Sequence, residues 1–157
     1  MEIKFEKGLL GLEVYKSFEL KDIDEVDSFK LLQCKEEPDI GLVLVSPFEV
    51  EEKYEFEISD SIEKQIGAKS IENLLVFTTV NINSDPSKMT TNLRAPIIIN
   101  TVDKKGIQVI LNNEQYKIKH PISKGWFNVS DYKKRRWIYI NRWWYRDNNF
   151  KNFGWKY

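Results

Sequence analysis

The 157-residue chain is poor in the residues that carry most chemistry, since Cys34 and His120 are its only cysteine and histidine. One cysteine excludes an internal disulfide and any metal cluster built on several thiolates. The stretch QCKEE around Cys34 shows no sign of an activated thiol, so we interpret Cys34 as buried and His120 as a strand-end residue. P-loop, GxGxxG and GxSxG motifs are missing too. No catalytic residue, cofactor or metal is therefore predicted, and the chain is not expected to be an enzyme.

Long apolar runs are also missing from this sequence. None approaches the roughly 20 residues that a membrane-spanning helix needs, and the first residues, MEIKFEKG, lack the apolar core of a signal peptide. We therefore expect a cytoplasmic protein with no membrane partner. The acidic run DIDEVD at 22–27 lacks the glycine and the distant glutamate of a calcium loop, which favours a solvated loop.

The net charge of the chain is zero, but the charges are unevenly distributed along it. Residues 123–157 hold nine of the 24 Lys and Arg, two of the 24 Asp and Glu, and all five Trp. Residues 1–122 are correspondingly acidic. This break predicts a folded domain over 1–122 and an atypical basic, Trp-rich tail over 123–157 that is not part of the fold.

Short strand patterns fill the acidic part of the chain. Residues 4–6, 17–23 and 54–59 alternate apolar with polar, which predicts half-buried strands. Residues 40–45 and 74–82 are dense and β-branched, which is typical of strands buried on both faces. Residues 95–111 read as a hairpin with Gly106 in the turn, and residues 116–121 end the series at Pro121.

One helix is expected in SDSIEKQIG, between Ser59 and Gly67. Ser59 or Asp60 can cap its start, Glu63 can close a capping box, and Gly67 can end it. A short turn is expected in residues 71–75. These patterns predict a mostly β fold, a small antiparallel barrel-like or sandwich domain with one or two short helices.

Carboxylates are concentrated in KEEPD at 35–39 and FEVEEKYEFEISD at 48–60. In a strand over 54–59, alternation places Tyr54, Phe56 and Ile58 inward and Glu55 and Glu57 outward. Such a face is either a solvated strand surface or a docking surface for a basic protein, because a negative field attracts basic partners and repels nucleic acid.

Six stretches in order resemble the flagellar assembly factor W family, FliW. They are GLLGLE (8–13), LLQCKEEPDIGLVLVSPF (31–48), YEFEIS (54–59), MTTNLRAPIIIN (89–100), GIQVIL (106–111) and YKIKHPI (116–122). The fourth is the most specific. Leu10 stands where the family often has proline, and Gly41 where it often has alanine.

The resemblance implies a small β-barrel-like fold and a function in binding without catalysis. Members of the family bind flagellin and the RNA-binding translational regulator CsrA, which represses flagellin translation, and the two partners exchange on the factor. Flagellin and a CsrA-type regulator are therefore the expected partners, with no direct nucleic-acid contact.

Candidate partner-binding residues follow from both arguments. We expect a surface turn beside the acidic strand, a negative field along that strand, and a polar edge before the strand at 97–100. The residues are, in that order, Asp39, Ser46, Pro47 and Phe48; Glu51, Glu52, Glu55 and Glu57; and Thr90, Asn92 and Arg94. For Pro47 and Pro96, turn and strand-edge geometry without partner contact is the simpler interpretation.

The tail needs a separate interpretation, because family members usually end near residue 122. The stretch KKRRWIYINRWWYR at 133–146 interleaves cations with aromatics, as single-stranded nucleic-acid grooves do. An RNA-binding β domain that uses this tail is therefore an alternative function. However, when residues 128–154 are written in A/T-rich codons and read one nucleotide later, the product opens MLVITRKEDGY, which resembles the start of CsrA. Our hypothesis is that the tail is the neighbouring regulator gene read out of frame, and that it packs poorly on the body.

Overall fold

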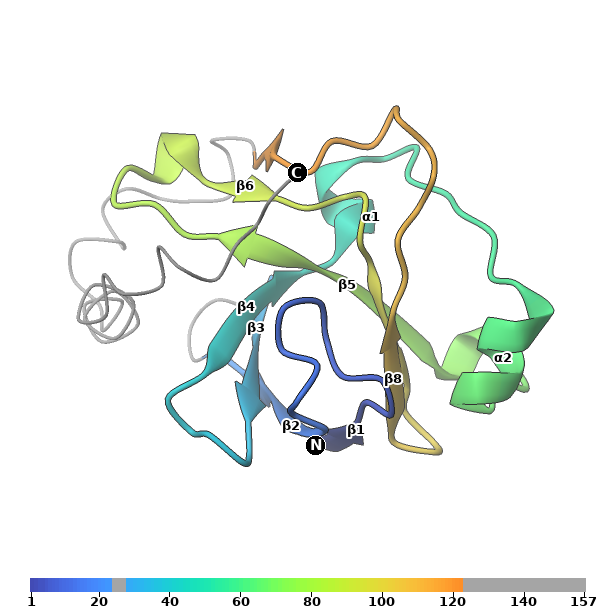
Figure 1. Ribbon diagram of the computed structural model, residues 1–157. Coiled ribbons are helices and arrows are strands. Elements are labelled where there is room, and N and C mark those ends of the chain that lie inside the picture. Colours follow the sequence, from blue (N-terminus) through green and yellow to red (C-terminus); the bar gives the residue numbers. More distant parts are fainter. Residues whose placement is uncertain (24–27, 123–157) are drawn as a thin grey trace.

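A computed structural model describes residues 1–23 and 28–122 of the chain (Figure 1). The predictions for the tail, which are its out-of-frame origin and its poor packing on the body, lie outside the described residues. So do Asp24, Glu25 and Asp27 of the acidic run. Asp22, at the start of that run, is described, and its carboxylate accepts a hydrogen bond from Lys30 Nζ at 2.7 Å.

The strands of the described residues pair in the order β4-β3-β2-β1-β8-β7-β5-β6-β9, and an additional β4–β5 pairing closes the first seven of them into a barrel, with β6 and β9 extending from β5. Its elements are β1 (Glu2–Lys4), β2 (Ser17–Asp22), β3 (Phe29–Cys34), β4 (Gly41–Val45), α1 (Pro47–Val50), α2 (Asp60–Ile66), η1 (Ile71–Asn73), β5 (Leu74–Asn81), η2 (Pro86–Lys88), β6 (Thr90–Thr91), β7 (Ile97–Asn100), β8 (Lys105–Gln108) and β9 (His120–Pro121). The prediction of a small, mostly β barrel with short helices is confirmed. Its pairings are antiparallel except that between β1 and β8.

The dense stretch at 40–45 contributes Val43, Leu44 and Val45 to the core, as predicted, whereas in β5 only Phe77 and Thr78 are buried, so the prediction of burial on both faces was wrong for most of 74–82. All four residues of β7 are buried, with Ile97 and Ile99 in the main cluster and Ile98 packed with Ile66 of α2. In β4, Leu44 faces the main cluster, while Val43 and Val45 face a second one. Both strands are therefore covered on both faces, because opposite faces of the sheet receive successive side chains.

Gly106 lies within β8 and not in the hairpin turn, so that prediction was wrong. The turn is formed by residues 101–104, and Lys104 there has a positive φ of 56°. The glycine serves close packing: a Cβ at residue 106 would lie 2.4 Å from Phe5 Cε1 and 3.0 Å from Ile3 Cγ2. Both are fully buried side chains of the main cluster.

The helix at residues 60–66 is confirmed as α2. Gly67 ends it with a left-handed φ of 68°, and the Gly67 N–H donates to the carbonyls of Glu63 and Lys64. Ser59 is the N-cap residue, but its side chain makes no capping hydrogen bond. The capping box predicted with Glu63 therefore does not form.

Three strand predictions were too long or wrong. Residues 54–59 form no strand, only residues 120–121 of the last predicted strand pair with a neighbour, and β1 includes only Lys4 of the KFE stretch. A strand needs a partner at ladder distance, and the barrel offers none to residues 54–59. The next section shows what holds this segment instead.

Candidate protein-interaction surface

Residues 48–57, called the acidic segment below, run from α1 toward α2 along the outside of the barrel (Figure 1). The predicted inward and outward sides are confirmed although the strand is not. Tyr54 is buried and Phe56 half-buried, whereas Glu55 and Glu57 are exposed. The alternation therefore reflects an extended chain lying on a packed surface, without a ladder of backbone hydrogen bonds.

Two tyrosine hydroxyls take the place of that ladder. Tyr116 Oη donates to the Glu55 carbonyl at 2.8 Å and accepts from the Glu55 N–H at 2.9 Å. Tyr54 Oη donates to the Leu93 carbonyl at 2.8 Å. The two rings lie 4.6 Å apart between centroids, and burial, with a smaller contribution from Tyr116, raises the pKa of Tyr54 above its ordinary value of 10.0. Both tyrosines therefore fix the backbone at Glu55 to the barrel.

The carboxylates of the acidic segment point away from this anchor. Glu52, Glu55 and Glu57 are exposed, as is Glu49 on α1, and Glu51 is half-buried. Within residues 1–23 and 28–122, none of these five forms an ion pair. Glu51 makes one local contact, its Oε1 accepting from the Lys53 N–H at 3.2 Å.

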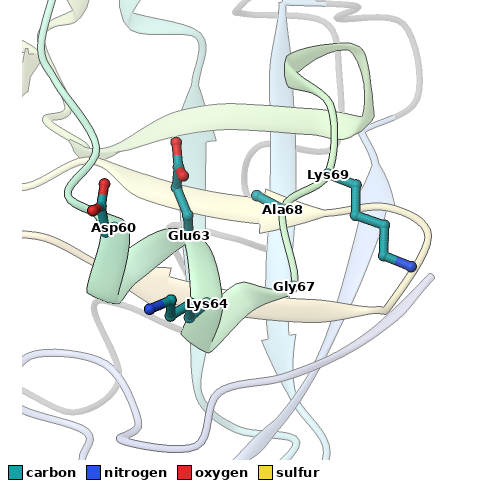
Figure 2. A pocket seen from close by; sticks show the side chains of 6 residues that line it. All are labelled: Asp60, Glu63, Lys64, Gly67, Ala68 and Lys69. Atoms are coloured by element: carbon teal, nitrogen blue, oxygen red, sulfur yellow. The ribbon is translucent and has the colours of Figure 1, made fainter.

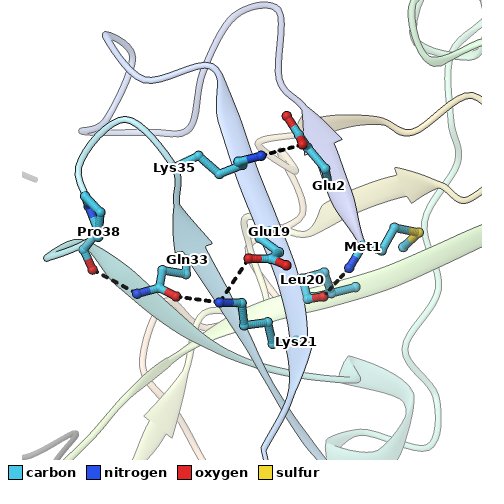
Figure 3. A network of polar contacts seen from close by, with 8 residues as sticks. All are labelled: Met1, Glu2, Glu19, Leu20, Lys21, Gln33, Lys35 and Pro38. Atoms are coloured by element: carbon cyan, nitrogen blue, oxygen red, sulfur yellow. Dashed lines mark hydrogen bonds and ion pairs between the residues drawn. The ribbon is translucent and has the colours of Figure 1, made fainter.

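On the β1–β2–β3 face of the barrel, in contrast, charged side chains pair with one another (Figure 3). There Lys21 Nζ contacts Glu19 Oε2 and Gln33 Oε1, both at 2.9 Å, and Lys35 Nζ contacts Glu2 Oε2 at 2.5 Å. Gln33 in turn donates to the Pro38 carbonyl at 2.9 Å. These charges are neutralised within the chain, unlike the carboxylates of the acidic segment.

Phe48 adds an aromatic side chain to this field. Its side chain is 50% exposed, and its ring packs edge-on against Tyr54 at 5.7 Å between centroids. Ser46, Pro47 and Phe48 were predicted to form a surface turn; Ser46 is the N-cap residue of α1, and Pro47 is buried in its first turn. Aromatic side chains are enriched where protein interfaces bind most strongly, so this exposed ring, held by a buried one, is the candidate anchor for a partner protein.

Asp39 does not join this surface. It lies in the β3–β4 connection, before β4, while Ser46 follows β4. The strand between them separates the two by about 20 Å. Asp39 and residues 46–48 therefore do not form one surface turn as predicted, because an extended strand between them holds them apart.

The predicted polar edge, residues Thr90, Asn92 and Arg94, is half-buried. Arg94 Nε donates to the Tyr116 carbonyl at 3.0 Å, and Asn92 Oδ1 accepts from the Arg94 N–H at 3.1 Å. Thr90 pairs with Pro121 of β9. Arg94 therefore secures the loop that carries Tyr116, which gives it a structural role next to the acidic segment.

A pocket at α2 and the residues that follow it is another candidate site (Figure 2). Asp60, Glu63, Lys64, Gly67, Ala68 and Lys69 line it. Charges of both signs surround it, and among the described residues there is no group of three or more His, Cys, Asp or Glu side chains able to hold a metal ion. Cys34 is buried, as expected, and desolvation raises the pKa of its thiol.

Sequence reasoning missed Tyr116, whose hydroxyl bonds the Glu55 backbone from 61 residues away. Nothing in the local pattern of residues 116–122 signals that role.

Comparison with known proteins supports a role in protein interaction. The model of the FliW protein family matches residues 1–122. The chain belongs to the FliW family. It is 45% identical over 119 residues to the flagellar assembly factor FliW of Clostridium botulinum strain Alaska E43, covering 76% of this chain and 84% of the relative. It is 47% identical over 120 residues to the Clostridium tetani factor of the same name, covering 76% and 83%.

A solved structure agrees with these relatives. A crystal structure of the flagellar assembly factor FliW superposes with a TM-score of 0.73 at 31% identity, covering 77% of this chain and 84% of that one. The family resemblance of the sequence is therefore confirmed, and by its family the chain is a flagellar assembly factor. Among the helices of residues 1–23 and 28–122, none is long and apolar enough to cross a membrane.

Proposed function

We propose that this FliW-family chain acts in the cytoplasm by binding flagellin and a CsrA-type translational regulator in exchange for one another, without catalysis. The observation that carries the proposal is the acidic segment. It combines an exposed Phe48 with carboxylates that form no ion pair within the described residues, on a backbone fixed by Tyr54 and Tyr116. A preorganised surface loses less entropy on binding than a mobile one.

In this proposal the charge of the surface produces the regulatory effect. An RNA-binding protein presents cations to phosphates, and those cations are attracted to a field of carboxylates. Once the acidic chain is docked, like-charge repulsion lowers the affinity of the regulator for RNA. Flagellin, when abundant, occupies the factor and leaves the regulator free to repress translation.

Calorimetric titration of the full chain with the cognate CsrA-type dimer, and separately with flagellin, tests the proposal. Saturable binding of both, with each partner displacing the other, is the expected result. Failure to bind the regulator at low ionic strength would overturn the proposal.

A charge-reversal pair locates the surface. The double variant Glu52→Lys/Glu55→Lys reverses two exposed carboxylates of the acidic segment, and we expect it to weaken regulator binding by about tenfold or more. Its matched control, Glu72→Lys/Asp103→Lys, reverses two exposed carboxylates on η1 and in the β7–β8 turn. Equal losses in both doubles would assign the effect to net charge alone.

The RNA-binding alternative rests on residues 133–146, outside the described residues. It predicts that the full chain retains labelled single-stranded RNA in a gel-shift assay and that a chain ending at residue 122 does not. Regulator binding by the shortened chain would support the acidic segment as the functional surface.

A further inference from the structure

A groove with apolar walls lies between the end of the acidic segment and the residues that follow α2. Phe56 and Ile58 line it from the first of these two stretches, and Ala68, Ile71 and Leu74 line it from the second. Its volume is about 320 Å³, whereas an apolar cavity of about 150 Å³ is enough for a benzene ring. The groove is therefore large enough to receive a bulky apolar side chain of another protein.

Ile71 is the side chain of this groove that the fold leaves uncovered. The other four apolar residues are half-buried and pack against the buried cluster around Ile66. Ile71 lies outside that cluster and is 83% exposed. It begins η1, whose N-cap residue Ser70 accepts a backbone hydrogen bond with its side chain. A large apolar side chain that is fixed and uncovered, with charged residues around it, is typical of a surface that binds another protein.

The charge beside the groove indicates what kind of segment it receives. Glu55 and Glu57 are exposed on either side of Phe56 in the sequence, and Glu63 of α2 lines the groove. None of the three carboxylates forms an ion pair within the described residues. Lys69 is the one cation among the described residues that line the groove, and its side chain extends away from α2 (Figure 2). The surroundings therefore favour an apolar side chain with cations beside it.

We propose that this groove receives an apolar side chain which the basic regulator carries between Lys or Arg residues. The inference rests on the proposed function for the identity of the partner only. The apolar side chain packs against Ile71 and Leu74, and its basic neighbours pair with Glu57 and Glu63. Exposed charge pairs contribute little to affinity by themselves, whereas a side chain buried in a pocket can dominate it. The groove therefore fixes the position of a partner that the carboxylates attract.

Synthetic peptides test the groove without the partner. The probe is a short peptide in which leucine alternates with lysine. One control replaces every leucine by serine, and a second control replaces every lysine by glutamate. In amide NMR spectra of the full chain, we expect the probe to shift the resonances of residues 56–58 and 68–74, and neither control to do so. Equal shifts with either control, or no localised shift with the probe, would overturn the proposal.

Substitution of Ile71 tests the groove with the regulator itself. Ile71→Ser removes an exposed apolar side chain and keeps every carboxylate, so we expect calorimetric titration to show a loss of affinity of about tenfold or more, with the salt dependence of binding unchanged. The matched control is Val14→Ser, because Val14 is 79% exposed in the loop between β1 and β2.

The two possible failures are distinguishable. If the unmodified chain binds the regulator and Ile71→Ser binds it equally well, the groove proposal is overturned and the proposed function stands. If the unmodified chain does not bind the regulator, the proposed function is overturned, and the peptide titration alone decides whether the groove receives an apolar side chain flanked by cations.

Discussion

Replacing Tyr116 by phenylalanine tests whether a side chain takes the place of a strand ladder at Glu55. The change removes one oxygen and, with it, a donated bond of 2.8 Å and an accepted bond of 2.9 Å, both to the backbone of Glu55. The Phe ring keeps the packing against Tyr54 and Leu93 in their shared cluster. The perturbation is therefore confined to two hydrogen bonds.

The expected loss follows from the worth of such bonds. A hydrogen bond contributes about 0.5–1.5 kcal/mol net, and a backbone group left unpaired costs more when it is buried. Water can reach part of this backbone because Glu55 is exposed, so we expect a decrease of about 1–2 kcal/mol in the free energy of unfolding. The Glu55 amide should also exchange its hydrogen faster, because its acceptor is gone.

Urea unfolding and amide hydrogen exchange measure both effects. Tyr15→Phe is the matched control: Tyr15 is half-buried, and its hydroxyl has no hydrogen-bond partner among the described residues. The control should change the stability by less than about 0.5 kcal/mol. If Tyr116→Phe behaves like the control, and Glu55 exchange is unchanged, the anchoring role is refuted.

Three further predictions concern the barrel itself. Gly106→Ala should destabilise by about 2–3 kcal/mol in urea unfolding, since its Cβ would lie 2.4 Å from a buried ring, whereas Gly41→Ala, which meets only a Leu31 methyl at 3.2 Å, should cost clearly less. The pKa of Tyr54 is raised in the folded state, so above pH 10.0 the folded chain binds more protons than the unfolded chain. The free energy of unfolding should therefore decrease as the pH rises above 10.0. In Tyr54→Phe this decrease should be smaller, which unfolding measurements at rising pH can check. Desolvation raises the pKa of Glu36, but hydrogen bonds from the N–H groups of Lys16 and Ser17 outweigh it and hold the pKa below 4.5. Glu36→Gln should therefore be less stable than wild type at pH 7. The difference in the free energy of unfolding should shrink as the pH falls below 4.5.

The sequence predicts the barrel well where burial alone decides. The β-branched run that became β4 contains its own signal, because a strand covered on both faces needs apolar residues at nearly every position. The run that became β5 has the same pattern, yet only Phe77 and Thr78 of that strand are buried. The end of α2 was equally readable, since a left-handed residue at a helix terminus favours glycine. The family was identified from six short stretches, and that identification is confirmed.

The predictions that failed share a physical cause. Each depended on which distant residue packs against the segment in the fold, and the local sequence does not show this. Residues 54–59 carry a strand pattern, yet strand formation depends on a partner that local sequence does not reveal, and here the partner is a hydroxyl from Tyr116. Gly106 was interpreted as a turn residue, although what requires glycine is the approach of Phe5 from the other end of the chain. Arg94 has a structural role that its sequence neighbours do not reveal, since carbonyls of a distant loop accept its hydrogen bonds.

The anchoring of the acidic segment by tyrosines has a consequence for binding that a strand would not share. In a ladder every second side chain and both backbone edges are committed to neighbours. Here one residue, Glu55, has its backbone fixed by a hydroxyl, and the glutamates around it keep their carboxylates in water. The acidic segment is therefore fixed to the barrel while most of its carboxylates stay exposed. Under the proposed function these water-exposed carboxylates are what a basic partner contacts, so charge reversal at Glu52 and Glu55 is expected to weaken its binding more than charge reversal elsewhere on the barrel.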